Sequence, residues 1–189
     1  MIGLHGKARS GKDTVAKVLE ALYGYQRTAF ANPVKRAVAA AYGLPESYVF
    51  NDDNKLLPIP GFTEKTLRTA MQEMGTEFFR SKDSTHWSRV WLNCYLGIPG
   101  DNPVVISDVR FENEAALIRS LGGVVIHIHR DGAGLTGENA AHASEAGIEM
   151  HSTDVGLSNN STFEELEERL QYALGFVEKY GVGRSLVLV

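Results

Sequence analysis

Residues 6–14 read Gly-Lys-Ala-Arg-Ser-Gly-Lys-Asp-Thr, and this stretch decides the expected fold. It follows an apolar segment, residues 1–5, and precedes residues 13–23, which carry apolar side chains at helical spacing. A glycine-rich turn between a strand and a helix lets backbone N–H groups converge on an anion, and the helix dipole favours negative charge there. The spacing G-x-x-x-x-G-K is that of the phosphate loop, in which Lys12 reaches the terminal phosphates of a nucleotide. We therefore expect the loop to bind nucleotide phosphate; a plain glycine-rich turn with a surface lysine is the alternative.

Strand and helix patterns alternate along the rest of the chain. Apolar residues at helical spacing predict helices, and short apolar runs bounded by glycine or proline predict strands. The expected helices cover residues 13–23, 33–42, 63–80, 86–96, 111–121 and 161–177, and the expected strands cover residues 1–5, 26–31, 104–108, 124–129 and 153–157. This alternation predicts an α/β fold of three layers, in which helices cover both faces of a mostly parallel sheet of about five strands.

Three segments lie outside this alternation. Residues 43–62 are rich in proline and are expected to form an irregular connection, whereas the polar, glycine-containing residues 130–150 are expected to form a lid. Residues 184–189 fit either an edge strand or a dimer contact. Because a domain usually has about 150 residues, one domain over residues 1–189 is expected.

Composition excludes several classes of protein. Apolar residues make up 43% and charged residues 22% of the 189 residues, which is typical of a globular domain. The net charge of −4 gives no basic surface for a nucleic-acid duplex or an anionic membrane. The single cysteine, Cys94, cannot form an internal disulfide, and no apolar run approaches the ~18 residues of a membrane span. Since the loop begins almost at Met1, we expect no leader segment and a location in the cytoplasm.

Two acidic residues are candidates for holding Mg²⁺ beside the loop. Asp108 ends the most apolar strand, at the edge of a parallel sheet where ligands bind, although it could also cap the next helix. Asp13 stands where most phosphate loops have a hydroxyl. We expect Asp13 to help hold hydrated magnesium, with Thr14 as a hydroxyl ligand or a cap; the alternative is that Asp13 only caps the helix and points away from the nucleotide.

Several arginines could gather the phosphate groups of two substrates in an acidic protein. Arg110 follows Asp108 closely and is the best candidate for the phosphate of the acceptor, while Arg130 precedes the lid and could cover the transferring phosphate. The further candidates are Arg9, Arg68 and Arg80. The alternative for Arg110 is a surface ion pair, and the alternative for Arg68 and Arg80 is a solvated helix charge.

With these residues in view, the chain resembles the deoxynucleoside monophosphate kinases of bacteriophages over nearly its whole length, up to about Tyr180. The resemblance rests on motifs in the same order and at similar spacing: residues 6–14, 29–35 (Ala-Phe-Ala-Asn-Pro-Val-Lys), 72–77 (Gln-Glu-Met-Gly-Thr-Glu), 106–114 (Ile-Ser-Asp-Val-Arg-Phe-Glu-Asn-Glu), 142–145 (His-Ala-Ser-Glu) and 159–160 (Asn-Asn). Aspartate after the loop lysine is shared with that branch.

The resemblance implies a homodimeric enzyme that transfers the γ-phosphoryl group of ATP to a deoxynucleoside monophosphate, supplying DNA precursors in the host cytoplasm with Mg²⁺ as cofactor. It also implies an acceptor-side helical region at about residues 33–96. Motifs and resemblance together predict catalytic roles for Lys12, Arg130 and Asp108; ATP contacts for Gly6, Arg9, Ser10, Gly11, Lys12, Asp13, Thr14 and Asn159; and acceptor contacts for Phe30, Lys35, Arg68, Arg80, Trp87, Arg110, His142 and Glu145.

Some of these roles have alternatives that the sequence leaves open. Phe30 and Trp87 could stack on a base, but an aromatic residue at helical spacing is more often part of a core. His142 and Glu145 are expected to position substrate or close the lid, because phosphoryl transfer needs little acid–base help. Another small-molecule kinase of the phosphomevalonate kinase type, or a nucleotide-dependent switch, remains an alternative function.

Overall fold

The computed structural model describes residues 1–96, 103–134, 146–180 and 186–188. The chain divides into two compact units, which we call the sheet unit (Met1–Ala29 and Gly100–Val189) and the insertion unit (Phe30–Pro99). Each unit has its own core and is described by itself. None of the helices in the described part of the chain is both long and apolar enough to cross a membrane.

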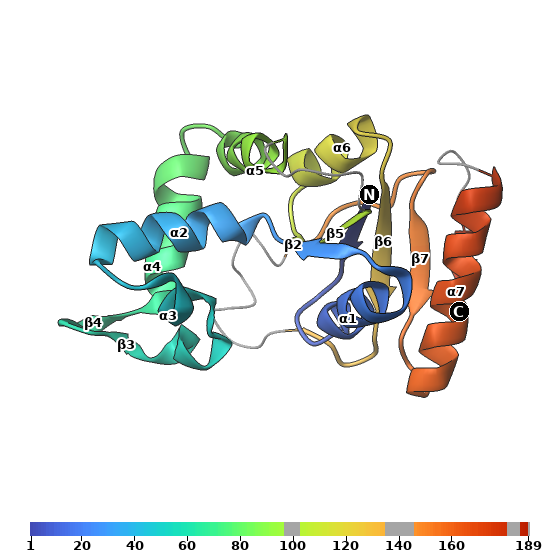
Figure 1. The fold of residues 1–189 in the computed structure, drawn as a ribbon, viewed down its shortest axis with the longest axis horizontal. Coiled ribbons are helices and arrows are strands. Elements are labelled where there is room, and N and C mark those ends of the chain that lie inside the picture. The colour runs from blue at the N-terminus through green and yellow to red at the C-terminus, as the bar shows by residue number, and fades with distance from the viewer. Residues whose placement is uncertain (97–102, 135–145, 181–185, 189) are drawn as a thin grey trace. The chain divides into compact units, whose positions relative to one another are not determined.

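The sheet unit alternates strands with helices (Figure 1). Its elements are β1 (Ile2–His5), α1 (Lys12–Tyr23), β2 (Gln26–Thr28), β5 (Val104–Val109), α6 (Glu112–Ser120), β6 (Val124–His129), β7 (Val155–Ser158), α7 (Phe163–Tyr180) and β8 (Leu186–Leu188). The strands form one sheet in the order β2-β5-β1-β6-β7-β8, and every neighbouring pair is parallel. The predicted α/β fold is confirmed, with β8 as a sixth strand, so the edge-strand alternative holds for residues 186–188.

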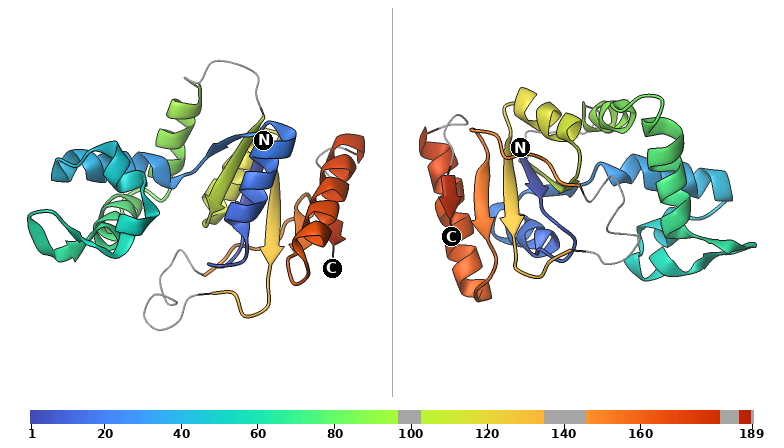
Figure 2. Two further views of the ribbon diagram at one scale, coloured as in Figure 1. Left: turned by 60° about the horizontal axis from the view of Figure 1, so that its bottom comes forward. Right: turned by 180° about the vertical axis from the view of Figure 1, so that it is seen from behind.

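Side-chain alternation along β1 explains the three layers of the sheet unit. Ile2 and Leu4 are buried in one cluster with residues of α1 and α7, and α7 lies beside β7 and β8 in both views of Figure 2. Gly3 points to the opposite face, where a Cβ would lie 2.4 Å from Cδ1 of Ile118 on α6. Helices therefore cover both faces of the sheet, and the glycine lets α6 approach closely.

The insertion unit is mostly helical. Its elements are α2 (Ala31–Tyr42), α3 (Glu46–Phe50), the 3₁₀-helix η1 (Asp52–Leu56), β3 (Pro58–Ile59), β4 (Phe62–Thr66), α4 (Leu67–Gln72), the π-helix η2 (Glu73–Arg80) and α5 (His86–Leu96). A buried cluster from these elements forms the core: Val38, Ala39, Val49, Ile59, Leu67 and Ala70.

The boundaries expected from sequence need correction in four places. Residues 43–62 are not irregular, because they contain α3, η1, β3 and the start of β4. The helix expected from residue 63 begins at Leu67, since Thr66 caps it by accepting a hydrogen bond from the Thr69 N–H. The second strand ends at Thr28 and α2 begins at Ala31, and the strand expected at 153–157 covers Val155–Ser158.

Candidate active site

The loop between β1 and α1 closes around the ammonium group of Lys12. Its Nζ donates hydrogen bonds to the carbonyl oxygens of Gly6, at 2.7 Å, and Lys7, at 2.8 Å. The lysine is buried, with 9% of its surface exposed, although it carries a full charge. The backbone thus holds a cation at the loop, where charge–charge attraction can act on a bound phosphate.

Two glycines make this tight loop sterically possible. Gly11, the N-cap residue of α1, has φ 103°, and a Cβ there would lie 2.2 Å from Nδ2 of Asn159. A Cβ on Gly6 would lie 2.4 Å from the carbonyl oxygen of Ile128. Any side chain at either position would displace the loop. No side chain caps α1 at Gly11, so the first turn of the helix can offer its N–H groups to an anion.

Asn159 braces the loop from the carboxyl end of β7. Its Nδ2 donates to the carbonyl oxygen of Ser10 at 2.8 Å, and its backbone N–H donates to the carbonyl oxygen of His129 at 2.7 Å. Asn159 is itself buried. The sequence predicted an ATP contact for this residue, and the structure adds a bracing contact between β6 and the loop.

Ser10 carries a buried polar group without a partner. Its side chain is 1% exposed, and its Oγ is the one buried side-chain N or O atom in the described part of the chain that lacks a hydrogen bond. A buried hydroxyl of this kind is available to hydrogen-bond an oxygen of a ligand at the loop. Ser10 lines a pocket together with His5, Gly6, Lys7, His127, Ile128, His129, Arg130 and Ala133. Lys7 and Arg130 make this pocket suited to an anion.

The candidates Asp108 and Arg110 lie at the carboxyl end of β5, next to β1. Val109 pairs with His5, the last residue of β1, and the His5 ring Nδ1 bonds to the Val109 carbonyl oxygen at 2.9 Å. The backbone N–H of Arg110 donates to the buried carboxylate of Glu114 at 2.8 Å. The structure therefore brings Asp108 and Arg110 to the strand end beside the loop, as expected for open parallel sheets.

His5 lies among cationic groups at this edge. Burial lowers the pKa of its imidazole; the hydrogen bond to Val109 opposes that effect, and nearby His127, Lys12 and Arg110 lower the pKa further. This environment disfavours the charged imidazole. Sequence analysis of the histidines did not single out this residue.

Asp13 has a partner that the sequence did not predict. Its carboxylate forms an ion pair with the guanidinium of Arg27 on β2. The Asp13 side chain is 79% exposed and that of Arg27 is 28% exposed. The pair joins the first turn of α1 to the strand at the sheet edge, and the cap of α1 is Gly11, not Asp13. Arg27 lies on the strand that follows α1 by only a few residues. A basic residue at that place was the one sequence signal that could have predicted a partner for Asp13.

The other candidates of the sheet unit are placed as follows. Arg9 is exposed and has φ 65°, a strained backbone conformation for a residue with a side chain. Thr14 and Arg130 are also exposed. His142 and Glu145, and the middle of the expected lid, lie outside the described residues.

In the insertion unit, the aromatic candidates are part of the core. Phe30 is 3% exposed and packs on Trp91 with ring centroids 5.1 Å apart. Trp87 is 4% exposed, and its Nε1 donates to the carbonyl oxygen of Gly75 in η2 at 2.8 Å. This burial favours the core alternative over base stacking.

The basic candidates of the insertion unit have local contacts. Lys35 lies 5.1 Å from the ring centroid of Phe50 and 3.9 Å from the Asp52 carboxylate. Arg80 donates to the carbonyl oxygen of Ser84 at 3.0 Å, and Arg68 is half-buried. These contacts leave their proposed roles toward an acceptor untested.

The parallel sheet, with a glycine-rich loop and a buried lysine at the start of α1, defines the class of the protein: it has the fold of the phosphate-loop kinases. Comparison of sequences then gives the family. The family model for deoxynucleotide monophosphate kinase matches residues 1–57 and 54–170. The chain belongs to the deoxynucleotide monophosphate kinase family, and it is a kinase.

Individual relatives agree with this assignment. A protein of Acanthamoeba polyphaga mimivirus, whose name provisionally assigns it the same activity, is 33% identical over 186 residues, covering 90% of this chain and 93% of the relative. The deoxynucleotide monophosphate kinase of Enterobacteria phage T4 is 23% identical over 239 aligned positions, covering 92% and 98%. That of Escherichia phage RB69 is 28% identical over 112 residues, covering 58% and 45%. The family expected from the sequence motifs is confirmed.

Proposed function

We propose that this kinase transfers the γ-phosphoryl group of ATP to the phosphate of a deoxynucleoside 5′-monophosphate, giving the diphosphate. The observation that carries the proposal is the Lys12 ammonium, held by two backbone carbonyls inside a loop at the start of α1. The name of the family and of the phage T4 relative supports the choice of acceptor. The proposed role is the supply of DNA precursors in the host cytoplasm, by a homodimer.

In the reaction, an oxygen of the acceptor phosphate bonds to the γ-phosphorus while the bond from that phosphorus to the β–γ bridging oxygen breaks. The acceptor oxygen is already deprotonated at neutral pH, so no general base is required. The transition state is loose and spreads negative charge over the γ oxygens. Lys12 would compensate this charge on the donor side, with Arg130 over the transferring group and Arg110 on the acceptor phosphate.

Asp13 and Asp108 are the residues that would hold Mg²⁺. No three His, Cys, Asp or Glu side chains of the described residues gather into a metal site of their own. Two carboxylates at one sheet edge fit this cofactor, because Mg²⁺ takes one or two protein carboxylates and completes its shell with water and phosphate oxygens. When bound, the ion would neutralise phosphate charge; the residues here supply its position.

The proposal is tested by measuring ADP formation with ATP alone, with each deoxynucleoside monophosphate, and with phosphomevalonate. We expect ADP only when a deoxynucleoside monophosphate is present, in amounts equal to the diphosphate formed. ADP formation with phosphomevalonate as the single active acceptor would support the alternative of a kinase of the phosphomevalonate kinase type. Rapid ADP formation without any acceptor would support the nucleotide-dependent switch.

A further inference from the structure

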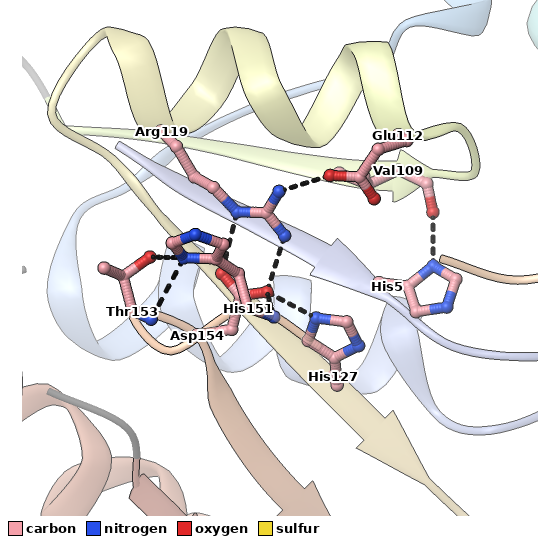
Figure 3. A network of polar contacts seen from close by, with 8 residues as sticks. All are labelled: His5, Val109, Glu112, Arg119, His127, His151, Thr153 and Asp154. Carbon is pink, nitrogen blue, oxygen red and sulfur yellow. Dashed lines mark hydrogen bonds and ion pairs between the residues drawn. The ribbon is translucent and has the colours of Figure 1, made fainter. Parts of the chain in front are cut away.

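A buried carboxylate on the α6 face of the sheet has no role in the chemistry proposed above. Asp154, directly before β7, is 0% exposed. It accepts hydrogen bonds from Nε of Arg119 at 3.0 Å, Nη2 of Arg119 at 2.6 Å, Nε2 of His127 at 2.8 Å and the backbone N–H of His151 at 2.9 Å (Figure 3). We call Arg119, Asp154 and His127 the buried network. It joins α6, β6 and the segment before β7.

The network reaches the phosphate loop through two rings. Because Nε2 of His127 donates to Asp154, the imidazole of His127 has one fixed orientation. Its ring lies edge-on to the ring of His5, with centroids 5.0 Å apart and planes at 67°. His5 in turn bonds through Nδ1 to the carbonyl oxygen of Val109, as Figure 3 shows. His5 directly precedes Gly6, whose carbonyl oxygen binds the Lys12 ammonium.

A purely structural role does not explain why this chain of contacts is polar. Burying a charged pair costs desolvation energy, and apolar side chains of the same volume often stabilise a fold as well or better. What a fully bonded polar network provides in addition is a single geometry. Here the fixed rings of His5 and His127 line the same pocket as Gly6, Lys7 and the unpartnered hydroxyl of Ser10.

We infer that His127 is a positioning residue: oriented by Asp154, it holds His5 and thereby sets the start of the phosphate loop for nucleotide binding. This inference rests on the proposed nucleotide-binding role of the loop. Asp154 is fully buried and acts only through its neighbours, and His127 is held by its bond to Asp154. Their effect is transmitted by packing and hydrogen bonds over one short path on β6 and β1.

The first test uses the unaltered protein. Nitrogen-15 NMR of the imidazole rings at pH 7.5 reports which ring nitrogen carries the proton. We expect a proton on Nε2 of His127 and on Nδ1 of His5, both before and after ATP is added. A His127 ring whose Nε2 has no proton would overturn the inference, because the bond to Asp154 would then have no donor.

The second test compares three variants. His127→Phe keeps a ring of similar volume but removes the donor, His127→Gln keeps an N–H donor, and His151→Ala is the control. In Figure 3 the His151 side chain bonds to Thr153, while the His151 backbone N–H, which donates to Asp154, is kept in this variant. ATP affinity and the amide shifts of residues 6–12 are measured without any acceptor, at a temperature where every variant is folded.

We expect His127→Phe to weaken ATP binding by about 10- to 100-fold, the loss expected when the displaced loop no longer makes one hydrogen bond to a charged phosphate. The amide signals of residues 6–12 should shift, while His151→Ala remains close to the parent and His127→Gln, which keeps a donor for Asp154 but lacks the ring beside His5, loses less than His127→Phe. Parent-like affinity in His127→Phe, or equal losses in the Phe and Gln variants, would overturn the inference. A parent that binds ATP but phosphorylates no deoxynucleoside monophosphate would refute the proposed function and leave this inference standing.

Discussion

The two units of the chain hold their charged side chains in different ways. In the sheet unit, Lys12 is buried against backbone carbonyls. The Arg119 side chain is 15% exposed, and it forms an ion pair with the fully buried carboxylate of Asp154. In the insertion unit, two ion pairs are more exposed: Arg36 and Glu46 are 51% and 63% exposed, and Arg89, the partner of Asp83, is 67% exposed. Exposed pairs are worth little, whereas buried charges hold one geometry. The buried charges of the sheet unit are therefore held in one geometry, whereas these exposed pairs of the insertion unit can rearrange at small cost.

Removing the buried charge should have the largest effect. Asp154→Asn leaves the Arg119 guanidinium without its carboxylate, which should lower the free energy of unfolding by about 3–5 kcal/mol at pH 7. Glu112→Gln removes the exposed partner of the same arginine and should cost at most about 1 kcal/mol. Urea unfolding of the three proteins measures both values, and equal losses would show that burial does not distinguish the two contacts.

The same carboxylate makes stability depend on pH. Burial alone would raise the pKa of Asp154, but hydrogen bonds from His127, Arg119 and the His151 backbone outweigh it and hold the pKa well below its ordinary value. A lowered pKa in the folded state stabilises the fold above the unfolded pKa, near 4, and this contribution is lost as the pH falls. Between pH 5 and pH 2 the parent should therefore lose more unfolding free energy than Asp154→Asn. If the unfolding free energies of the parent and of Asp154→Asn fall by the same amount over this pH range, the lowered pKa of Asp154 is contradicted.

The next prediction concerns the buried lysine. Lys12→Ala should remain folded and lose roughly 100- to 1,000-fold in kcat, since it removes a cation from the place where charge develops. Lys17→Ala, an exposed lysine on the same helix, is the matched control and should retain parent activity. Steady-state kinetics with ATP and a deoxynucleoside monophosphate checks both variants. If the Lys12 variant keeps most of the parent kcat, the loop binds phosphate but has no catalytic role.

A further prediction separates the donor site from the acceptor site. Arg110→Ala should raise KM for the monophosphate about tenfold or more, the loss expected for one hydrogen bond to a charged group, with a much smaller rise for ATP. Arg36→Ala, which breaks an exposed pair in the insertion unit, should change neither constant. An increase confined to ATP would move Arg110 to the donor site.

The smallest expected effect concerns Asp13. Its ion pair with Arg27 competes with a metal ion, so Arg27→Gln should lower the magnesium concentration for half-maximal rate by about two- to fivefold, in line with an exposed pair worth up to 1 kcal/mol. Asp13→Ser should shift the same titration in the opposite direction. If both titrations overlay that of the parent, Asp13 has no metal role and serves only as the partner of Arg27.

Local patterns explain why much of the sheet unit could be predicted. The loop at residues 6–12 combines a fixed spacing with a strand before it and a helix after it, so backbone chemistry alone indicates its role. The run Val104–Ile106 is apolar without alternation because both faces of a central parallel strand are covered. Asp108 and Arg110 then follow from the rule that ligands bind at the carboxyl ends of such strands.

Contacts between distant residues explain what the sequence did not reveal. Asp154 meets His127 and Arg119, which are 27 and 35 positions away, and no periodicity connects them. The hairpin of β3 and β4 turns at Pro60 and Gly61, but its strands are too short to show alternation, so proline content alone suggested a loop. Trp87 could not be placed by spacing, because its partner is a π-helical carbonyl that exists only in the folded insertion unit.

The position of the tryptophans has a spectroscopic consequence. The sequence has two tryptophans, Trp87 and Trp91, and both are buried in the insertion unit. Tryptophan emission therefore follows the unfolding of that unit alone, while far-ultraviolet circular dichroism follows both units. If the two signals change at the same urea concentration, the units unfold as one cooperative system; if the emission changes first, the insertion unit opens while the phosphate loop is still formed.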